Sequence, residues 1–377
     1  MLGCGYVANM YRLTLPAHPE LTLAGVFDRE RARAETMARL TGATAYPSFE
    51  ALLADDAVPL VLNLTNPHAH YETTRVLLEA GKHVWTEKPL AMRLDEAQAL
   101  VALAEERGLA LASAPTTLMN PVAQTVWKAI RDGAIGRVRL VYAEMDDGMV
   151  PRAPVAKWIN EAGVAWPAAD EYEVGCTVEH AGYVLSWLCA FFGPVEALTA
   201  HAEIVLLDKI PGLTLAPAPD FSVAGLRFRD GTVARMTNGI YADHDHRLAF
   251  WGDEGALIVE DPRSDRSAVT LRRYRTLRRR RWLDKGRRLP LIGLKERIAR
   301  YRGSQTRDFC RGIADMAAAV AAGRAPYLSA RLGLHVAEVT MACHWGGRPE
   351  GRDHGWGVTP YRPVTNFPAM EPLPWPR

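Results

Sequence analysis

Three short stretches of the sequence carry residue types that could do chemistry. In the first, Glu87, Lys88 and Pro89 follow the apolar pair Val84 and Trp85. That pair predicts a short buried strand, and Pro89 keeps the strand from continuing. Lys88 then stands at the carboxyl end of a strand, where open α/β sheets bind ligands, so its amine could contact a substrate or a cofactor. A solvated lysine in a turn is the alternative interpretation.

The second stretch is a glycine-rich turn near the start of the chain. Its pattern is Gly3-x-Gly5-x-x-Ala8, with Tyr6 and Val7 between the last two positions. Glycines let a backbone turn tightly and approach a pyrophosphate, while the amides of the following helix face its negative charge. The turn therefore predicts a dinucleotide site.

Only Met1 and Leu2 precede this turn. The first strand of such a sheet usually needs about five residues. We therefore expect the first strand to be truncated, as it would be if the start of the chain were misplaced.

An acidic residue follows the turn at the distance that a dinucleotide site requires. Residues 21–27 predict a second strand, and Asp28 stands at its end, about 20 residues beyond the turn. A carboxylate there can accept hydrogen bonds from the hydroxyls of the adenosine ribose, which favours NAD. Arg29 and Arg31 could instead bind a 2′-phosphate, so NADP stays open.

The third stretch opens an apolar helix after Gly175 and contains Glu179, His180 and Tyr183. Near the helix start, His180 could be exposed to a ligand, and its ordinary pKa of about 6.5 suits proton exchange with an alcohol. Glu179 lies about 100° around the helix from His180. Tyr183, one turn further on, is a second candidate proton donor. A purely structural histidine is the alternative.

Taken in order, these stretches resemble the Gfo/Idh/MocA family of NAD(P)-dependent sugar and polyol oxidoreductases. The resemblance extends over most of the chain, from Gly3 to His344. It implies hydride transfer between the nicotinamide of NAD or NADP and a hydroxyl-bearing carbon of a sugar, polyol or nucleotide-sugar. It also implies a homo-oligomer, because members of the family are often dimers or tetramers.

The resemblance implies roles for individual residues. His180 takes the hydroxyl proton, while the positive Lys88 stabilises the developing alkoxide and orients the ribose. Because these residues come from different domains, the active site is expected in the cleft between the domains. The expected catalytic residues are Lys88, His180, Glu179 and Tyr183, and the expected substrate contacts are Lys88, Trp158, Cys176, His180 and His244. Further polar residues suited to sugar hydroxyls are Asp146, Asp147, Lys157, Asp243 and His246.

The expected cofactor contacts lie at carboxyl edges of predicted strands. The strand 59–64 ends in the polar run 65–70, which resembles the family loop beside the nicotinamide ribose. The complete expected set is Gly3, Gly5, Tyr6, Val7, Asp28, Arg29, Thr65, Asn66, His70, Glu87 and Lys88.

One position departs from the family pattern. An aspartate usually stands four residues before the catalytic histidine, on the same helix face, but this chain has Cys176 there. A thiol is a poor hydrogen-bond acceptor. Glu179 could hold the imidazole of His180 only if the first helical turn were distorted. The departure leaves open a non-catalytic dinucleotide or sugar sensor built on the same fold.

Two pairs of histidines raise the question of a metal ion. His68 and His70 stand in a loop without a nearby Cys or carboxylate, where roles in loops and helix caps are more common. His244 and His246 would share one face of a strand, as metal ligands require. Because hydride transfer to a nicotinamide needs no metal ion, we expect none.

Composition bounds the class of protein. A chain of 377 residues favours about two domains, and its 48% hydrophobic and 23% charged residues are typical of a soluble globular protein. No apolar run approaches the roughly 18 residues of a membrane span, and no leader segment is recognisable, so a cytoplasmic location is expected. The five cysteines include no CxxC pair, which argues against a disulfide framework or a zinc site.

The order of the predicted elements indicates an α/β chain with two domains. Residues 1–114 alternate strands and helices and are expected to form a doubly wound, parallel Rossmann sheet. Residues 115–357 contain successive strands without intervening helices, which predicts an α+β domain with a largely antiparallel open sheet. Residues 358–377 form a Pro-rich tail that is expected to lie extended on a surface.

Positive charge is concentrated in one segment. Residues 271–302 hold fourteen Lys and Arg and two acidic residues, in a chain whose net charge is only +2. Such a run is most often a solvated loop or helix face, which could pair with the acidic remainder of a subunit partner. Nucleic acid, an acidic membrane surface or the diphosphate of a nucleotide-sugar are alternative partners. Few aromatic residues are interleaved, so we expect no nucleic acid.

Overall fold

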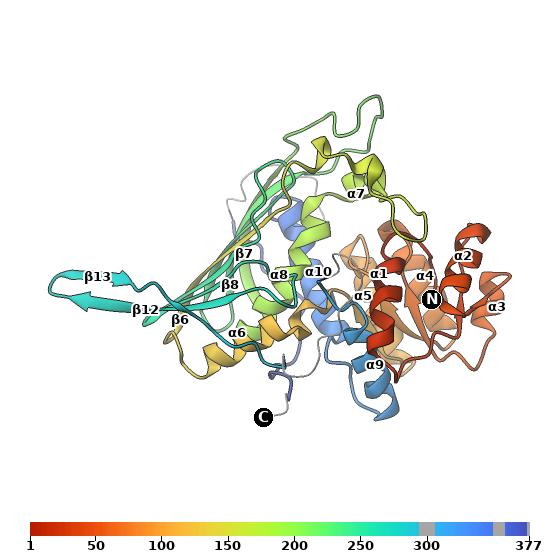
Figure 1. The fold of residues 1–377 in the computed structure, drawn as a ribbon, viewed down its shortest axis with the longest axis horizontal. Coiled ribbons are helices and arrows are strands. Elements are labelled where there is room, and N and C mark those ends of the chain that lie inside the picture. Colours follow the sequence, from red (N-terminus) through yellow and green to blue (C-terminus); the bar gives the residue numbers. More distant parts are fainter. Residues whose placement is uncertain (294–305, 350–358, 375–377) are drawn as a thin grey trace. The chain divides into compact units, whose positions relative to one another are not determined.

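The computed structural model describes residues 1–293, 306–349 and 359–374 (Figure 1). The chain divides into two compact units. The first unit comprises Met1–Thr116, Arg152–Val174 and Tyr301–Ala337. The second unit comprises Thr117–Pro151, Gly175–Arg300 and Glu338–Arg377.

A parallel sheet lies at the centre of the first unit. Its strands are β1 (Gly25–Val26), β2 (Thr44–Ala45), β3 (Leu60–Asn63), β4 (His83–Thr86) and β5 (Leu111–Ser113). β1 pairs with β2, and β4 lies between β3 and β5, all in parallel. Leu2 bridges Phe27 on one side and Asn63 on the other, so it takes the place of a strand between β1 and β3. The predicted Rossmann-type sheet is confirmed.

The strand predicted at 21–27 is shorter in the structure and is confined to β1. The amino group of Met1 donates a hydrogen bond to the carbonyl of Gly25, the first residue of β1, at 2.9 Å. Residues 21–24 form no regular strand and are partly exposed.

Helices connect these strands as the sequence pattern predicts. Those of the first unit are α1 (Ala8–Thr14), α2 (Arg31–Thr41), α3 (Phe49–Leu53), α4 (His70–Glu79), α5 (Leu94–Glu106), α7 (Ala168–Val174) and α9 (Arg311–Ala321), and α10 (Ala330–His344) spans the division. α2 ends at Gly42, whose φ of 78° closes the helix. α3 begins at Ser48, whose side chain accepts a hydrogen bond from the amide of Ala51.

The second unit is built on an open mixed sheet (Figure 1). Its strand order is β13-β12-β11-β10-β6-β9-β8-β7, with β14 paired to β12. β6 and β9 pair in parallel and the other neighbours are antiparallel, which confirms the predicted, largely antiparallel sheet. The strands are β6 (Val138–Asp146), β7 (Val195–Glu203), β8 (Phe221–Phe228), β9 (Val233–Gly239), β10 (Leu248–Gly252), β11 (Gly255–Val259), β12 (Val269–Leu277), β13 (Arg280–Leu283) and β14 (Arg287–Arg288).

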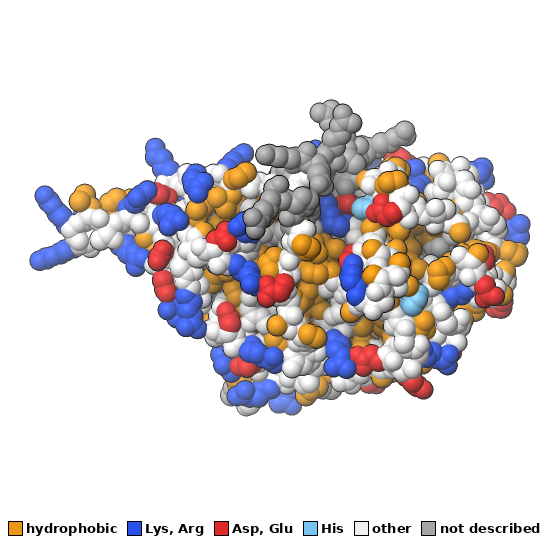
Figure 2. All heavy atoms as spheres, turned by 90° about the horizontal axis from the view of Figure 1, so that it is seen from below, with side chains coloured by type: hydrophobic (Ala, Val, Ile, Leu, Met, Phe, Trp, Pro, Cys, Tyr) orange, Lys and Arg blue, Asp and Glu red, His pale blue; other side chains and the backbone are white. Residues whose placement is uncertain are grey.

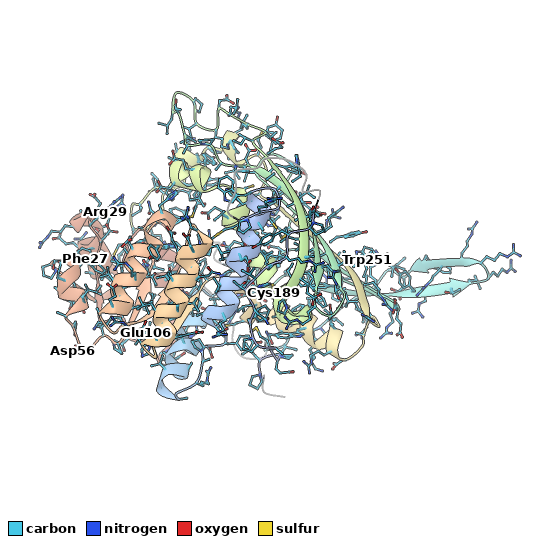
Figure 3. All side chains as sticks on the ribbon, turned by 180° about the vertical axis from the view of Figure 1, so that it is seen from behind. Phe27, Arg29, Asp56, Glu106, Cys189 and Trp251 are labelled. Carbon is cyan, nitrogen blue, oxygen red and sulfur yellow. The ribbon has the colours of Figure 1, made fainter. Side chains whose placement is uncertain are left out.

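An apolar helix, α8 (Cys176–Phe192), packs on β6, β8 and β9 of this sheet. Cys189, labelled in Figure 3, is one of its fully buried side chains. α8 begins at Gly175, whose φ is 90° and where a Cβ would lie only 2.7 Å from Cε1 of His344. The glycine thus fixes where the helix starts and places His180 in its second turn. Among the described helices, none combines the length and the apolarity needed to cross a bilayer.

A buried carboxylate holds the carboxyl-terminal segment against the second unit. Tyr361 pairs with Leu198 of β7. Glu338 of α10, which is fully buried, accepts hydrogen bonds from the hydroxyl of Tyr361 at 2.5 Å and from the amides of Val364 and Thr365 at 2.8 and 2.9 Å. One side chain therefore satisfies several donors of the tail.

We predict that Glu338→Ala lowers the free energy of unfolding by about 3 kcal/mol, because the buried donors of the tail lose a charged acceptor. Glu371→Ala is the matched control, since its exposed ion pair with Arg131 should contribute less than about 1 kcal/mol. Chemical denaturation measures both variants. Equal stability of the two would show that Glu338 does not anchor the tail.

The basic segment is not the loop or helix face that its sequence suggested. β12 and β13 form a two-stranded antiparallel ribbon that turns at Arg278, where φ is 54°. β14 then pairs with the start of β12. Residues such as Tyr274, Thr276 and Trp282 favour extended backbone, which explains why a charged run forms strands. Residues 294–302 of the segment lie outside the described residues.

Candidate active site

A pocket of about 550 Å³ in the first unit gathers many of the predicted cofactor residues. The predicted residues that line it are Gly3, Gly5, Tyr6, Asp28, Arg29, Thr65 and Asn66. They come from the carboxyl ends of adjacent parallel strands, where open α/β sheets bind dinucleotides. Trp166 and Asp170 also line the pocket, and the side-chain amide of Asn66 donates a hydrogen bond to Asp170. The residues present therefore fit a dinucleotide.

The two glycines of the turn have different surroundings. Gly3 has a φ of 88°, and a Cβ there would lie 2.6 Å from the carbonyl oxygen of Leu64, so no side chain fits. Nothing lies within 4 Å of the position that a Cβ on Gly5 would take. Because Gly5 also lines the pocket, this open space allows a pyrophosphate to approach the backbone.

We predict that Gly5→Ala weakens binding of NAD(P)H by about tenfold or more while leaving the thermal unfolding temperature unchanged. The added methyl group would meet no protein atom but would occupy the space of the pyrophosphate. Gly3→Ala, by contrast, should lower both affinity and stability. Calorimetric titration and thermal unfolding separate the two effects. Binding by Gly5→Ala that equals the wild type would mean that the pyrophosphate does not cross this turn.

Asp28 lies at the pocket, and its carboxylate organises the turn. Oδ2 accepts a hydrogen bond from the amide of Cys4 at 2.7 Å, and Oδ1 accepts one from the amide of Glu30 at 2.8 Å. A carboxylate has further lone pairs, so ribose hydroxyls can still bind to it.

Two arginines beside Asp28 give the pocket positive charge. Arg29, labelled with Phe27 in Figure 3, lines the pocket together with Arg33. Arg31, which the sequence suggested as a phosphate ligand, instead pairs with Glu35 at 2.8 Å on the exposed side of α2. Arg33, in the first turn of α2, lines the pocket instead of Arg31. The pocket is compatible with NAD and with NADP.

Glu87 supports the loop that carries Lys88. The Glu87 carboxylate is buried and accepts hydrogen bonds from the hydroxyl of Tyr11 at 2.6 Å and from the amide of Lys88 at 3.0 Å. Burial and the adjacent Glu87 raise the pKa of Tyr11 well above its ordinary value, so Tyr11 keeps its proton and donates it. Lys88 itself is partly exposed.

His70 joins two of the carboxyl-edge loops. It is fully buried, with one ring nitrogen 2.7 Å from the carbonyl oxygen of Pro89 and the other 2.9 Å from that of Thr65. Burial lowers the pKa of His70. Of the predicted cofactor residues, His70, Val7, Glu87 and Lys88 lie outside the lining of the pocket. The position of His70 favours support of the loops over direct contact with a cofactor.

In the second unit, His180 meets a carboxylate from the end of β6. Its Nε2 lies 2.7 Å from Oδ2 of Asp147. The other ring nitrogen, Nδ1, is buried and has no hydrogen-bond partner among the described residues. If Nε2 donates its proton to Asp147, Nδ1 carries the lone pair and is the basic atom of the neutral ring.

Asp147 is the centre of a polar cluster that also includes His246 and Arg263. Its Oδ1 lies 2.7 Å from Nε2 of His246 and 3.0 Å from Nη2 of Arg263. Burial alone would raise the pKa of Asp147, but His180, His246 and Arg263 together hold it well below its ordinary value. Asp147 therefore stays negatively charged at neutral and mildly acidic pH.

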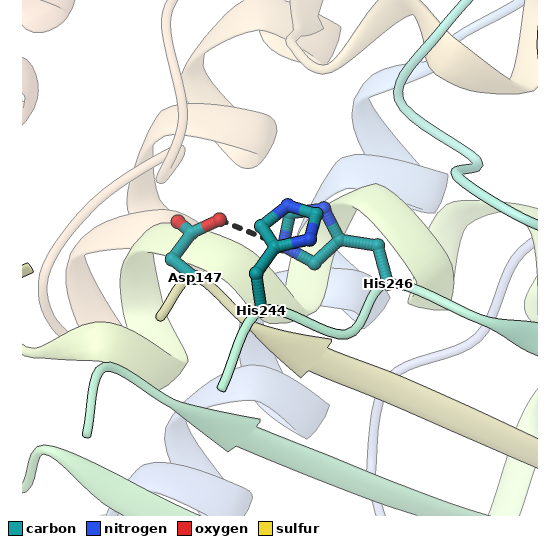
Figure 4. Close-up of side chains that lie close together, drawn as sticks. All are labelled: Asp147, His244 and His246. Carbon is teal, nitrogen blue, oxygen red and sulfur yellow. Dashed lines mark ion pairs between the residues drawn. The ribbon is translucent and has the colours of Figure 1, made fainter. Parts of the chain in front are cut away.

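The same cluster has some features of a metal site. Ligand atoms of Asp147, His244 and His246 lie within 4.8 Å of one another (Figure 4). However, Nη2 of Arg263 lies 2.8 Å from Nδ1 of His246. Since a guanidinium can only donate, Nδ1 accepts and the proton of the neutral ring is on Nε2, which then cannot bind a metal ion. The arrangement fits a hydrogen-bonded ion network better than a metal centre.

Asp147 makes the contact with His180 that the family resemblance assigns to the residue four before it. Cys176, at that position, is buried, and burial raises the pKa of its thiol. α8 is regular from its first residue, so the distortion that Glu179 would need is absent. The sequence alone suggests Asp147 only as a possible contact to sugar hydroxyls. The signal that could have found it is its place at the carboxyl end of a predicted strand.

The remaining predicted site residues lie in different places. Tyr183, one turn beyond His180, has its ring 5.9 Å from the guanidinium of Arg263. His244 is exposed beside His246, with ring centroids 4.1 Å apart. Trp158 belongs to the first unit, where its ring packs 5.1 Å from that of Trp166.

Asp146, which precedes Asp147 in the sequence, makes a pH-dependent contribution to stability. Burial and the carboxylates of Glu144, Asp245 and Asp147 raise the pKa of Asp146 to about 6 from an ordinary 3.8. The folded protein keeps this proton at pH values where the unfolded chain has released it. The contribution of Asp146 to stability therefore falls as the pH rises from about 4 to about 6, and the loss is complete above that range.

We predict that Asp146→Asn removes the loss of stability that Asp146 causes as the pH rises from about 4 to about 6, because an amide does not titrate. Chemical denaturation of both proteins at a series of pH values measures it. The wild type should lose stability relative to Asp146→Asn across the window from pH 4 to 6. Parallel pH profiles of the two proteins would contradict the raised pKa of Asp146.

Comparison with known proteins agrees with this geometry. Residues 1–114 match the oxidoreductase family with an NAD-binding Rossmann fold, and residues 123–258 match the Gfo/Idh/MocA C-terminal domain. The dTDP-3,4-didehydro-2,6-dideoxy-α-D-glucose 3-reductase of Streptomyces antibioticus is 36% identical over 291 residues, which cover 74% of this chain and 80% of the reductase. Among solved structures, a levoglucosan dehydrogenase in complex with NADH and levoglucosan has a TM-score of 0.73 at 19% identity, covering 94% of this chain and 97% of the other. The UDP-N-acetylglucosamine 3-dehydrogenase of Acidithiobacillus ferrooxidans has a TM-score of 0.68 at 21% identity, covering 92% and 95%.

The parallel sheet and its glycine-lined pocket, together with these matches, define an NAD(P)-dependent oxidoreductase. The chain belongs to the Gfo/Idh/MocA family. The resemblance drawn from its sequence is confirmed.

Proposed function

We propose that the protein transfers hydride between C4 of the nicotinamide and a ring carbon of a sugar carried by a nucleoside diphosphate. Support for this substrate class comes from relatives. The Streptomyces reductase is named for position 3 of a dTDP-sugar. The UDP-N-acetylglucosamine 3-dehydrogenase of Acidithiobacillus ferrooxidans, 33% identical over 154 residues, is named for the same position of a UDP-sugar. A free sugar or polyol is the broader class within which this proposal lies.

The observation that carries the proposed chemistry is the contact between His180 and Asp147. In the oxidation, Nδ1 of His180 takes the proton of the substrate hydroxyl while the hydride leaves the carbinol carbon for the nicotinamide. The imidazolium that forms is stabilised by the charge of Asp147. In the reduction, His180 returns the proton to the developing alkoxide. The bound nicotinamide supplies only the hydride chemistry.

Lys88 is the second proposed catalytic residue. Its loop is held by Glu87 and by His70, which fix the backbone on either side of the lysine. A positive amine near the reacting oxygen stabilises the charge that develops as the hydroxyl loses its proton. We propose that Lys88 serves this purpose and also orients the nicotinamide ribose.

The enzyme is further proposed to be a homo-oligomer in the cytoplasm. Residues 1–114 bind the cofactor in this account, while residues 115–357 supply the contacts to the substrate. The alternative of a non-catalytic sensor lacks comparable support. It was considered because Cys176 stands where the family has an acid, but Asp147 supplies a carboxylate to His180 instead. Mass photometry of the purified protein tests the oligomeric state.

A substrate panel tests the proposed function. UDP- and dTDP-sugars, free sugars and polyols are each incubated with NAD⁺ or NADP⁺, and matching keto compounds with NADH or NADPH, while nicotinamide absorbance is followed. We expect turnover with a nucleotide-sugar and a fall in kcat of about a thousandfold with His180→Gln. Turnover confined to free sugars would contradict the proposal of a nucleotide-sugar substrate but would still support the proposed hydride transfer. No turnover with any compound would favour a non-catalytic sensor.

A further inference from the structure

The segment 271–288, here called the basic ribbon, has a charge that the oxidoreductase chemistry does not use. It holds ten Lys and Arg and one acidic residue, Asp284. Because the whole chain has a net charge of +2, the rest of the protein is net negative. β12 and β13 of the ribbon extend past the sheet of the second unit (Figure 1), and Lys and Arg side chains stand out at this projecting end (Figure 2).

One face of the ribbon alternates arginine with apolar side chains. Leu277 pairs with Arg280, and Arg275 pairs with Trp282, so these four side chains lie on the same face. Leu277 is 66% exposed and Trp282 is 46% exposed. A large exposed tryptophan beside an exposed leucine is unusual on a solvated surface and indicates a contact with an apolar or interfacial phase.

Much of the charge at the tip is not neutralised within the chain. Arg275 lies 3.3 Å from Asp284, and the guanidinium of Arg281 stacks 4.0 Å above the ring of Tyr274. Arg278, Arg279 and Arg280, in contrast, are exposed and have no acidic partner among the residues that the structure describes. Their positive charge is available to an external partner.

We propose that the basic ribbon docks the enzyme on an anionic lipid surface. The arginines at the tip would bind headgroup phosphates, for which guanidinium has a matching donor geometry. Leu277 and Trp282 would enter the interfacial layer, where tryptophan is enriched because one side of its ring is apolar and its N–H is polar. Interfacial binding of this kind needs a charged and an apolar component on the same element, and the ribbon has both.

Other occupants account for fewer of these features. The phosphates of a nucleic acid would neutralise the arginines. However, the phosphate backbone offers no apolar surface to Leu277. A second copy of this chain offers few concentrated acidic patches, because many exposed acids are already paired with arginine or lysine. Such pairs are Arg31–Glu35, Arg75–Glu79, Arg93–Asp95, Lys128–Asp132 and Arg331–Glu105.

Sedimentation with lipid vesicles tests the proposal on the full-length protein. The vesicles contain phosphatidylcholine alone or phosphatidylcholine mixed with phosphatidylglycerol. One variant replaces Arg278, Arg279 and Arg280 by Gln, and a second replaces Leu277 and Trp282 by Ser. The matched control replaces Arg31, Arg39 and Arg93, three exposed arginines of the first unit, by Gln. Titration with NADH and NADPH verifies that each variant is folded.

We expect binding to the anionic vesicles only, decreasing as salt is raised. Each ribbon variant should lose about tenfold or more in affinity, and the arginine control should bind as the wild type does. Equal binding to both vesicle types, or full binding by either ribbon variant, would overturn the proposal. An absence of binding to the anionic vesicles would also overturn it. Tight binding of duplex DNA, or a smaller oligomer in the ribbon variants, would then identify nucleic acid or a second copy of the chain as the occupant.

Discussion

Lys88→Ala is expected to lower kcat by about a thousandfold, with the fold intact. The lysine is proposed to stabilise a negative charge that develops only in the transition state, and single groups of this kind contribute effects of that size. Its loop is held by Glu87 and His70, neither of which depends on the Lys88 side chain for the hydrogen bonds described. The unfolding temperature should therefore change little.

Steady-state kinetics on the best substrate of the panel, followed by thermal unfolding, tests this expectation. Lys128→Ala is the matched control, because Lys128 is an exposed residue of α6 (Pro121–Arg131) that pairs with Asp132 at the surface. Undiminished turnover of Lys88→Ala would refute the assigned role. Loss of turnover together with a large fall in unfolding temperature would instead assign Lys88 to the structure.

Asp147→Asn is expected to have a comparable effect, a fall in kcat of about a thousandfold. An amide in this place cannot stabilise the imidazolium of His180, and it can leave the ring in the wrong tautomer. Because Asp147 acts through His180, the double variant Asp147→Asn with His180→Gln should be no slower than His180→Gln alone. A purely structural role of Asp147 would give additive losses.

Glu179→Gln distinguishes the two carboxylates near His180. Glu179 is buried in the first turn of α8, whereas Asp147 makes the 2.7 Å contact with the imidazole. The pH profile of kcat should be displaced in Asp147→Asn and retained in Glu179→Gln. The reverse pattern would mean that Glu179 supports the histidine and that the Asp147 contact is incidental.

The cofactor unit was the part most open to prediction from sequence, for a physical reason. Its signals are local: Gly3 is required by its positive φ, and the polar runs after β3 and β4 mark carboxyl edges that parallel pairing brings together. The long α8 was likewise evident from its apolar run and its bounding glycines. These features depend on neighbours in sequence or on one general rule of sheet topology.

The proton-transfer centre depended on contacts that no local pattern contains. Asp147 meets His246 because β6 and β10 are antiparallel neighbours, so the end of one lies beside the start of the other. It meets His180 because α8 packs against β6. The parallel pairing of β6 with β9 is equally non-local. The family pattern directed attention to the residue four before His180, where a buried thiol stands. The carboxylate came from elsewhere in the fold.

Direct hydride transfer is the central claim, and isotope transfer tests it most directly. NADH or NADPH carrying deuterium at C4 is incubated with the protein and a keto-sugar substrate, and the product is analysed by mass spectrometry. We expect that one deuterium appears on the newly formed carbinol carbon, and that Lys88→Ala and His180→Gln each slow the transfer by about a thousandfold. A protein that binds the labelled cofactor but passes no deuterium to any sugar would contradict the central claim.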